Sequence, residues 1–351
     1  MKNISIILSL LAPLILCCTP AAAQKATTFA RGADISWITQ TEAAGRYKFC
    51  NDKGEVTDGY ALLKECGINA IRLRVWVHPM ADRWSGRAWC DTHDVVEKAV
   101  RAKQAGMEVM IDFHYSDWWA DPQKQNPPLA WQQCGIDALC DSVEAHTTAV
   151  LKALKRAGVK PRWVQVGNET PEGFMLPTGD AIEHPQNFAR LFATGYKACK
   201  KVFPKVKVLV HIDSGEKLAR TEFILNILQQ YRVPYDMVGW SLYPGMNWTT
   251  HSVEPNWHKK VDACIENIDS IYKHYHKEVM LVEVGMPDGD EKACCDAISW
   301  IIEKSGGLCR GLFYWEPLTT PDMGYGMGAL KPYNRTLLQP NEGLKAFRTP
   351  R

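Results

Sequence analysis

The sequence lacks the short signatures that would assign it at once to a common functional class. It has no CxxC pair and no Cys/His spacing typical of zinc, so we expect no structural metal. No Gly-rich phosphate-binding turn follows a β-rich run, which argues against a dinucleotide-binding sheet. Charge of one sign is also missing, because 41 basic residues meet 39 acidic ones and the net charge is +2. Such a balance gives no basic footprint for nucleic acid.

Long apolar runs and linkers are equally scarce. The uncharged run at residues 4–16 covers 13 residues, whereas a membrane span needs about 20. No stretch rich in Pro, Gly or Ser divides the 351 residues, so we expect one domain and no transmembrane segment. With 46% hydrophobic and 23% charged residues, the composition is that of a globular protein, which argues against disorder as the main state.

The N-terminus carries the pattern of an export signal. A single lysine precedes the apolar run, and Ala21-Ala22-Ala23 supplies small residues after it. This pattern predicts a secretory signal peptide at residues 1–23, cleaved after Ala23, and a mature domain at residues 24–351 in the extracellular or periplasmic space.

Two alternatives to a soluble exported protein stay open. The apolar run could remain uncleaved as a signal anchor. A bacterial lipid anchor on Cys17 or Cys18 is the other alternative, although residues 14–16 lack the small residue that usually precedes a lipidated cysteine.

Export would bring the cysteines into an oxidising compartment, where disulfides are plausible. Cys134 and Cys140 flank a short loop and are the best candidate pair. Cys66 lies in a helical pattern just before Gly67 and is better explained as a core residue.

The rest of the chain alternates between β-rich runs and helical patterns. Helices are expected at residues 92–105 and 141–157, and glycine ends several helical patterns, as at Gly67, Gly106 and Gly158. Eight strands spaced in this way predict βα units and a closed (β/α)₈ TIM barrel in the α/β class. The strands are expected at residues 32–36, 69–76, 107–114, 162–169, 206–213, 236–243, 278–284 and 310–315.

Two glutamates end otherwise apolar strands. Glu169 closes the fourth strand and Glu283 lies near the end of the seventh, and burying either carboxyl costs free energy unless it is paired or functional. The ends of these strands face each other across the mouth of the barrel, where active sites of this fold lie. Two carboxyl groups flanking a glycosidic bond suffice to cleave it. The alternative is a buried ion pair, for example between Glu283 and Arg72. Alternation along the second strand places Arg72 on one face with Arg74 and Trp76.

Tryptophan is the residue type present in excess. The chain has 13, against 10 Phe and 12 Tyr, and each buried indole N–H needs a partner. This number predicts a ligand with flat apolar faces, and a neutral sugar chain fits the small net charge better than a nucleobase does. Six tryptophans lie near predicted strand ends at the expected cleft: Trp37, Trp76, Trp118, Trp119, Trp240 and Trp315. Packing alone explains the others, such as Trp163 and Trp300.

A longer pattern follows the third strand: Asp112-Phe113-His114-Tyr115-Ser116-Asp117-Trp118-Trp119-Ala120-Asp121-Pro122. It resembles the signature of glycoside hydrolase family 53, the endo-β-1,4-galactanases. The resemblance spans the chain from about residue 31 to the C-terminus and includes both glutamates. Further matches occur in order at residues 31–37, 72–77, 166–169, 177–179 and 311–317.

The resemblance implies a hydrolase that cleaves β-1,4-galactan, the type I arabinogalactan side chains of pectin, by a retaining double displacement. In this family's scheme Glu169 would be the general acid/base and Glu283 the nucleophile. Arg72 would lie near Glu283 and keep it ionised.

Other residues take substrate-binding roles by the same resemblance. Asn168 would bind the 2-hydroxyl of the sugar in the −1 subsite, Tyr243 would orient the nucleophile, and Trp315 would form the floor under that sugar. The remaining candidates for hydroxyl contacts or sugar platforms are His114, Asp117, Trp119, Asp213 and Trp76.

The chain departs from the family pattern in three places. Trp118 stands where the signature usually has a small polar residue, and residues 284–287 differ from the usual sequence after the nucleophile. Some bacterial members carry a calcium loop after the seventh strand, of which only Asp288-Gly289-Asp290 is present here. We therefore expect no metal and no cofactor, with calcium as the alternative.

Two other functions stay open. The chain could be another retaining endo-glycanase of the same clan that acts on mannan or xylan. It could also be a non-catalytic glycan-binding barrel, although such proteins usually lack one of the two glutamates. In each case the expected partner is a polysaccharide, and we expect a monomer.

Overall fold

The computed structural model describes residues 28–83, 85–247, 252–287, 291–304 and 306–348. Eight parallel strands close into a barrel in the order β1-β12-β11-β8-β7-β6-β5-β4, which confirms the predicted (β/α)₈ fold. Every predicted strand is confirmed, with ends shifted by up to three residues. The barrel strands are β1 (Ala30–Asp34), β4 (Ala70–Val75), β5 (Glu108–Phe113), β6 (Trp163–Val166), β7 (Lys207–Ile212), β8 (Met237–Leu242), β11 (Glu278–Val284) and β12 (Cys309–Trp315).

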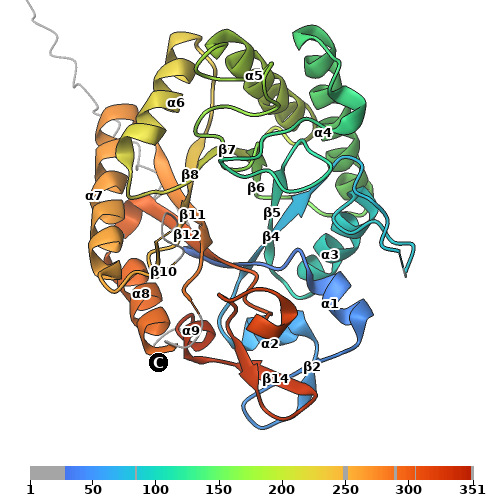
Figure 1. The fold of residues 1–351 in the computed structure, drawn as a ribbon, viewed down its shortest axis with the longest axis vertical. Coiled ribbons are helices and arrows are strands. Elements are labelled where there is room, and N and C mark those ends of the chain that lie inside the picture. Colours follow the sequence, from blue (N-terminus) through green and yellow to red (C-terminus); the bar gives the residue numbers. More distant parts are fainter. Residues whose placement is uncertain (1–27, 84, 248–251, 288–290, 305, 349–351) are drawn as a thin grey trace, which may run out of the picture.

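Helices surround the strands (Figure 1). The helices predicted at residues 92–105 and 141–157 are confirmed, although α4 begins earlier, at Ile136, directly after Gly135. The three predicted glycine stops have left-handed backbone, as expected where a helix ends. The helices are α1 (Ile38–Ala44), α2 (Gly59–Glu65), α3 (Thr92–Gln104), α4 (Ile136–Arg156), α5 (Pro185–Val202), α6 (Leu218–Gln230), α7 (Trp257–Tyr275), α8 (Glu291–Lys304) and α9 (Glu342–Lys345).

The barrel interior has an apolar lower part and a polar upper part. Alternate strand residues point inward, and one set of them forms a buried apolar cluster: Ala30, Ala70, Met110, Trp163, Leu209, Met237, Met280, Val282 and Phe313. The next inward positions, toward the carboxyl ends, hold polar side chains, among them Arg72, Asp112, Gln165 and His211. The apolar cluster therefore closes the barrel from below and leaves chemistry to its mouth.

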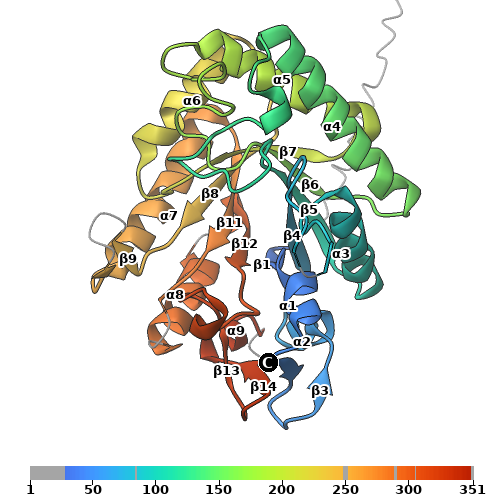
Figure 2. The same ribbon diagram turned by 45° about the vertical axis from the view of Figure 1, so that its right-hand side comes forward.

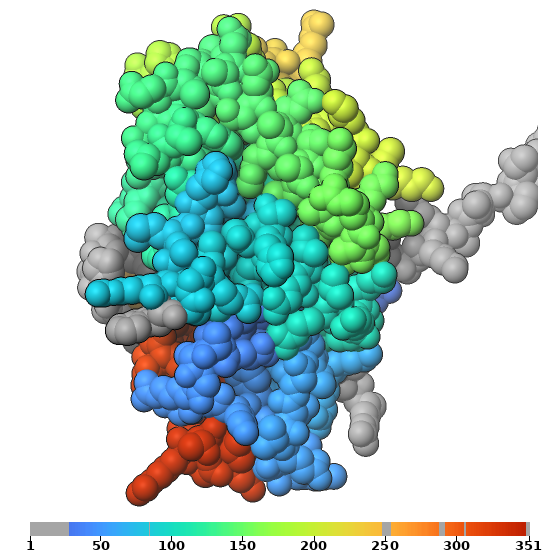
Figure 3. Space-filling view, turned by 90° about the vertical axis from the view of Figure 1, so that its right-hand side faces the viewer, coloured from blue at the N-terminus to red at the C-terminus, as the bar shows by residue number. Residues whose placement is uncertain are grey.

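A second, four-stranded sheet lies at one end of the molecule and was not predicted. Its order is β13-β14-β2-β3, so it joins the N-terminal and C-terminal parts of the chain, as Figure 2 shows. The same proximity appears in Figure 3, where the blue N-terminal part of the described chain lies beside the red C-terminal segment. The strands escape periodicity analysis because they are so short: β2 (Lys48–Cys50), β3 (Val56–Thr57), β13 (Leu330–Pro332) and β14 (Leu337–Pro340).

The cysteines of the described chain are thiols. Cys134 and Cys140 are not joined to each other, so the predicted disulfide between these two is wrong. Both side chains pack as small apolar groups against the large apolar core formed by strands and helices outside the barrel interior. This packing explains their position without a covalent link. Cys66 is fully buried, as expected for a core residue.

The N-terminal predictions concern residues that the structure does not describe. The signal peptide at residues 1–23 and the alternative lipid anchor on Cys17 or Cys18 therefore stay predictions. In the described ranges, none of the helices is long and apolar enough to cross a membrane.

Candidate active site

Arg72 lies at the centre of the polar upper half of the barrel. It comes from β4, is 1% exposed, and its guanidinium contacts side chains from several other strands and strand ends. Its charge offsets a cluster of carboxylates that could not be buried together without a cation. The contacts are Asp34 at 2.7 Å, Asp112 at 2.9 Å, Gln165 at 2.6 Å, Asn168 at 2.9 Å and Glu283 at 2.9 Å.

Glu283 reaches the interior through an irregularity in β11. Val282 belongs to the interior apolar cluster, so strict alternation would turn Glu283 outward. A register shift between Leu281 and Glu283 in the pairing with β8 breaks this alternation and brings Glu283 to the mouth. There one carboxylate oxygen contacts Arg72, and the other accepts a hydrogen bond from the Tyr243 hydroxyl at 2.9 Å.

These neighbours act on the proton affinity of Glu283 in opposite directions. Burial raises the pKa of Glu283 to about 7, with Arg72 lowering it and the nearby carboxylates Asp112 and Asp34 raising it. The Tyr243 hydroxyl stays protonated, because burial and the charge of Glu283 raise its own pKa. Tyr243 therefore donates to Glu283 and favours the ionised carboxylate.

Glu169 lies three residues after the end of β6, in a left-handed backbone conformation with φ 45°. Its side chain is half-buried at the mouth, and burial raises its pKa well above the ordinary value. The negative charges of Glu283 and Asp213 raise the pKa further, whereas a hydrogen bond with Ser241 lowers it. Glu169 is thus the carboxyl of the pair that keeps its proton to higher pH.

His211 links the backbone of Glu169 to Ser241. Burial and the nearby Arg72 hold the pKa of His211 well below its ordinary value, so the ring is neutral. Its Nδ1 accepts from the backbone N–H of Glu169 at 3.2 Å, and its Nε2 lies 2.9 Å from Oγ of Ser241. In the tautomer that accepts from Glu169, the ring proton lies on Nε2 and points to Ser241. Nδ1 also lies 3.1 Å from Oδ1 of Asn168, to which it donates in the other tautomer.

The remaining polar groups fix the strand ends around the pair. Asn168 donates from its amide to the carbonyl of Ala120 at 2.7 Å while accepting from Arg72, so its orientation is set. Gln125 donates to the backbone carbonyls of Asn168 and Glu169, both at 2.8 Å. His114 contacts Asp112 through Nε2 at 3.0 Å, and it accepts from the backbone of Ala120.

An aromatic wall stands beside this polar cluster. Trp37 lies edge-on to Trp119 and Trp315, with centroid distances of 5.9 and 5.2 Å. Arg74 lies beneath the wall, 4.2 Å from the Trp119 ring centre, and pairs with the buried Glu316 at 2.8 Å. Glu316 also accepts from the backbone N–H of Trp37, so one ion pair fixes the base of the wall.

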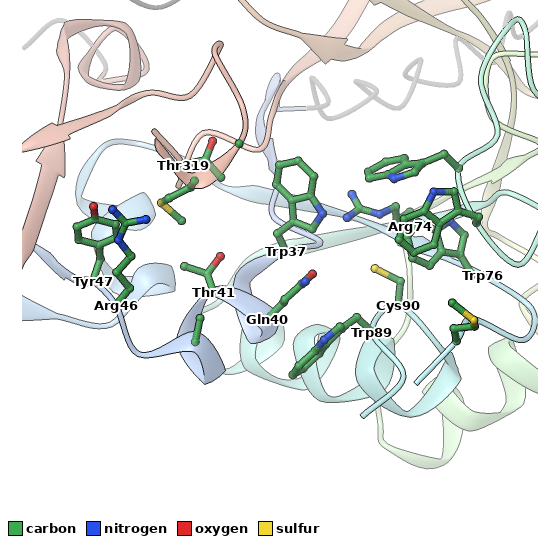
Figure 4. A pocket seen from close by; sticks show the side chains of 16 residues that line it. Trp37, Gln40, Thr41, Arg46, Tyr47, Arg74, Trp76, Trp89, Cys90 and Thr319 are labelled. Atoms are coloured by element: carbon green, nitrogen blue, oxygen red, sulfur yellow. The ribbon is translucent and has the colours of Figure 1, made fainter. Parts of the chain in front are cut away.

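A pocket of about 470 Å³ opens on the far side of the wall. It is lined by Trp37, Arg74, Trp76 and Trp119 together with residues from α1 and the loop after β12, as Figure 4 shows. Neither glutamate lines it. Trp37, Arg74 and Trp119 line the pocket and also belong to the wall or its base, so the pocket lies next to the site.

The sequence-predicted site residues fall into two groups. Arg72, Asn168, Glu169, Tyr243 and Glu283 come together around one centre, with Asp213 close enough to raise the pKa of Glu169. In the second group, Trp119 and Trp315 belong to the aromatic wall, and Trp76 and Trp119 line the pocket. His114 is buried next to Trp76 and Trp119.

Asp117 and Trp240 have other places than the sequence suggested. Both oxygens of Asp117 accept backbone N–H groups, of His78 at 2.8 Å and Leu129 at 2.9 Å, so the carboxylate ties loops together. Trp240 is not at the cleft: it is fully buried and donates to Thr221 on α6 at 2.8 Å, because alternation on β8 turns it toward the helices.

Several residues of the site were missed from the sequence. Gln125 lies in a loop far from any strand end, and only its hydrogen bonds reveal its role. His211 and Ser241 occupy inward positions of β7 and β8, so the alternation that found Arg72 was the available signal.

The possible calcium loop cannot be placed, since Asp288-Gly289-Asp290 lies outside the described residues. Across the rest of the described chain, no group of three or more His, Cys, Asp or Glu side chains could hold a metal ion. The expectation of a metal-free enzyme stays a prediction.

The chain is similar to known proteins over most of its length. The Endo-beta-1,4-galactanase of Bacillus subtilis (strain 168) is 29% identical over 320 residues, which cover 84% of this chain and 71% of the relative. The Arabinogalactan endo-beta-1,4-galactanase of Thermothelomyces thermophilus is 30% identical over 315 residues, 82% of this chain and 89% of the relative. A solved structure described as the Ignisphaera aggregans GH53 catalytic domain superimposes with a TM-score of 0.76 at 28% identity, covering 94% of this chain and 98% of that one.

The family model described as Glycosyl hydrolase family 53 matches residues 30–304, a range that holds both glutamates and most of the barrel. The resemblance seen in the sequence is confirmed: the chain belongs to glycosyl hydrolase family 53.

Proposed function

We propose that the protein is a retaining endo-β-1,4-galactanase that hydrolyses the β-1,4-galactan side chains of pectin. The observation that carries this proposal is the unequal pair of glutamates at the barrel mouth. Glu283 is held between a guanidinium and a phenol, whereas Glu169 keeps its proton to higher pH. The names of the relatives from Bacillus subtilis and Thermothelomyces thermophilus supply the substrate.

In the first step Glu169 donates its proton to the glycosidic oxygen while the carboxylate of Glu283 attacks the anomeric carbon. The bond to the leaving oxygen breaks, and a covalent glycosyl ester forms on Glu283. Tyr243 and Arg72 hold the two oxygens of Glu283, so that the attacking oxygen keeps its direction.

In the second step Glu169, now ionised, removes a proton from water. The water oxygen attacks the anomeric carbon and displaces Glu283, which gives net retention of configuration. We assign Asn168 to the sugar 2-hydroxyl and Trp315 to the apolar face of the sugar in the −1 subsite. His114, Asp117, Trp119, Asp213 and Trp76 are proposed to bind the rest of the chain directly or to position the residues that do.

The test is a substrate panel with a timed product profile. Purified protein should release reducing sugar from linear β-1,4-galactan and leave mannan and xylan intact, with short and long fragments appearing together early, as endo cleavage requires. Release from mannan or xylan alone would assign the barrel to another endo-glycanase. Binding of galactan with no cleavage of any glycan would identify a non-catalytic barrel.

We further propose that the enzyme is exported, acts as a monomer and needs no cofactor. A lipid anchor on Cys17 or Cys18 is the alternative to free export. Mass determination of the protein from its native host would distinguish cleavage after Ala23 from a lipidated cysteine.

A further inference from the structure

The aromatic wall continues past the catalytic centre as a row of indoles. Trp119 lies 5.6 Å from Trp315 and 5.4 Å from Trp76, and Trp118 follows at 4.8 Å from Trp76 with the two planes tilted by 33°. Trp118 is the last of the row and is 58% exposed on the pocket rim. A large ring left in water at the end of such a row presents an apolar face to whatever enters the pocket.

The loop that carries Trp118 is held in place. The neighbouring Asp117 carboxylate accepts from the backbone of His78 on one side and of Leu129 on the other. Met80, which also lines the pocket and is 86% exposed, lies just beyond His78. The rim is therefore built before a ligand arrives, which lowers the entropy lost on binding.

Some side chains of the pocket wall also carry buried nitrogen atoms. The indole N–H groups of Trp76 and Trp89 and two nitrogens of Arg74 are buried without an acceptor in the part of the chain that the structure describes. Buried donors normally have a partner. These nitrogens are closed to a ligand, so the exposed surface of the wall is the aromatic face of Trp118. A ligand with flat apolar faces, such as a pyranose chain, matches this surface.

The direction of the pocket follows from the proposed roles. Glu169 faces Asp213 and Ser241, on the β7 and β8 side, and the leaving group must lie next to this acid. Trp315, assigned to the −1 sugar, contacts Trp37 and Trp119, which line the pocket. The part of the substrate that remains on Glu283 therefore extends toward the pocket.

We propose that this pocket is a distal glycone subsite, in which Trp118 stacked on Trp76 binds a galactose unit remote from the cleaved bond. The subsite rests on the proposed galactanase function and makes it more specific, because it favours long substrates and sets the size of the fragments released. Trp118 is a specificity-determining residue and takes no part in the chemical steps.

The experiment compares W118A with wild type on galactan, on the β-1,4-linked galactose trisaccharide and on a hexasaccharide labelled at its reducing end. L129A is the matched control, because Leu129 is 77% exposed at the same rim and does not line the pocket. W118F keeps an aromatic face and serves as the rescue variant.

For W118A we expect kcat/KM on galactan to fall at least about fivefold, with the trisaccharide value kept within about twofold. Cleavage of the labelled hexasaccharide should move toward its non-reducing end, because fewer sugars are then held on the glycone side. L129A should match wild type, and W118F should recover most of the loss.

Two results would overturn the subsite while the function stands: equal rates for W118A and wild type on all lengths, or an equal loss on short and long substrates. If wild type itself does not cut galactan, the proposed function fails and the subsite fails with it. Melting temperatures of all variants show whether a loss reflects folding.

Discussion

Glu169 and Glu283 carry the same carboxyl group, and single neighbouring residues give each its chemistry. Glu283 has a guanidinium and a phenol on its two oxygens. Glu169 has like charges nearby and a hydrogen bond with Ser241, whose hydroxyl also contacts His211. Burial raises the pKa of both, and only Glu283 has a cation in direct contact to oppose it.

Removal of the Glu283 carboxyl should abolish turnover. E283A is expected to lower kcat on galactan by at least about a thousandfold, because no group is left to form the covalent ester. Azide should restore product formation with inverted configuration at the anomeric carbon, as detected by NMR of the glycosyl azide. E172A, at an exposed glutamate close to Glu169 in sequence, is the control and should keep wild-type activity. Full activity of E283A would end the assignment.

The pH profile should respond to the charge beside Glu169. Activity requires Glu283 to be ionised and Glu169 to be protonated. It should therefore fall at low pH, where Glu283 becomes protonated, and at high pH, where Glu169 loses its proton. Since the charge of Asp213 raises the pKa of Glu169, D213N should move the alkaline limb to lower pH. D141N, at an exposed position on α4, should leave both limbs in place. An alkaline limb unmoved by D213N would contradict this account.

The sequence predicts the two glutamates and Arg72, because buried charges at strand ends are rare and cost free energy. It does not predict how Glu283 turns inward, since alternation from Val282 places it on the other face. It also does not predict Gln125, whose role depends on hydrogen bonds to the backbone of a distant strand end. Asp117 fits the family pattern, but its two oxygens already accept backbone N–H groups.

At the scale of elements, the chain turns sharply where the strands end at the mouth. Four non-glycine residues just past β5, β6, β7 and β12 have left-handed backbone: Tyr115, Glu169, Ser214 and Glu316, with φ between 45° and 53°. Each costs roughly 1–3 kcal/mol. At Glu169 and Glu316 this cost is offset by the interactions that the side chain makes in the site. Such turns leave no periodic pattern, which is why predicted strand ends differ from the observed ones here.

The end of α2 should be sensitive to a single methyl group. Gly67 has φ 92°, and a Cβ there would lie 2.4 Å from the carbonyl oxygen of Phe347, near the C-terminal end. G67A should therefore lower the free energy of unfolding by about 2–4 kcal/mol, from conformational cost and backbone overlap. G45A meets nothing within 4 Å at φ 63° and should cost about 1 kcal/mol. Urea unfolding of both variants measures the difference, and equal losses would refute the overlap.

For the whole molecule, Arg72 joins strands that are far apart in sequence. Its five partners come from β1, β5, β6, the turn after β6 and β11. The residue that orients the nucleophile therefore also holds the strands of the barrel together at its mouth.

Loss of this guanidinium should unfold the protein more easily as well as inactivate it. R72M leaves Asp34, Asp112 and Glu283 buried without their cation and should lower the free energy of unfolding by about 3–5 kcal/mol. R162M breaks a pair with Glu108 at 3.5 Å on the partly exposed side and should cost at most about 1 kcal/mol. Thermal unfolding followed by circular dichroism measures both, and equal shifts would refute a special role for Arg72.

The barrel is predictable from the sequence because eight buried strands at regular spacing leave a strong signal. The sheet of β2, β3, β13 and β14 is not, since its strands are two to four residues long and pair across nearly the whole chain. Pairing of this kind depends on where the barrel brings the two ends, and no local pattern records it.

The cysteine side chains supply a set of native probes for local unfolding. A thiol-specific reagent should modify the three half-buried cysteines first and the seven buried ones only when their own segments open. The order of modification, read by mass spectrometry, would then rank the stability of regions spread over the barrel, with no label introduced. The buried cysteines are Cys50, Cys66, Cys90, Cys199, Cys264, Cys294 and Cys309.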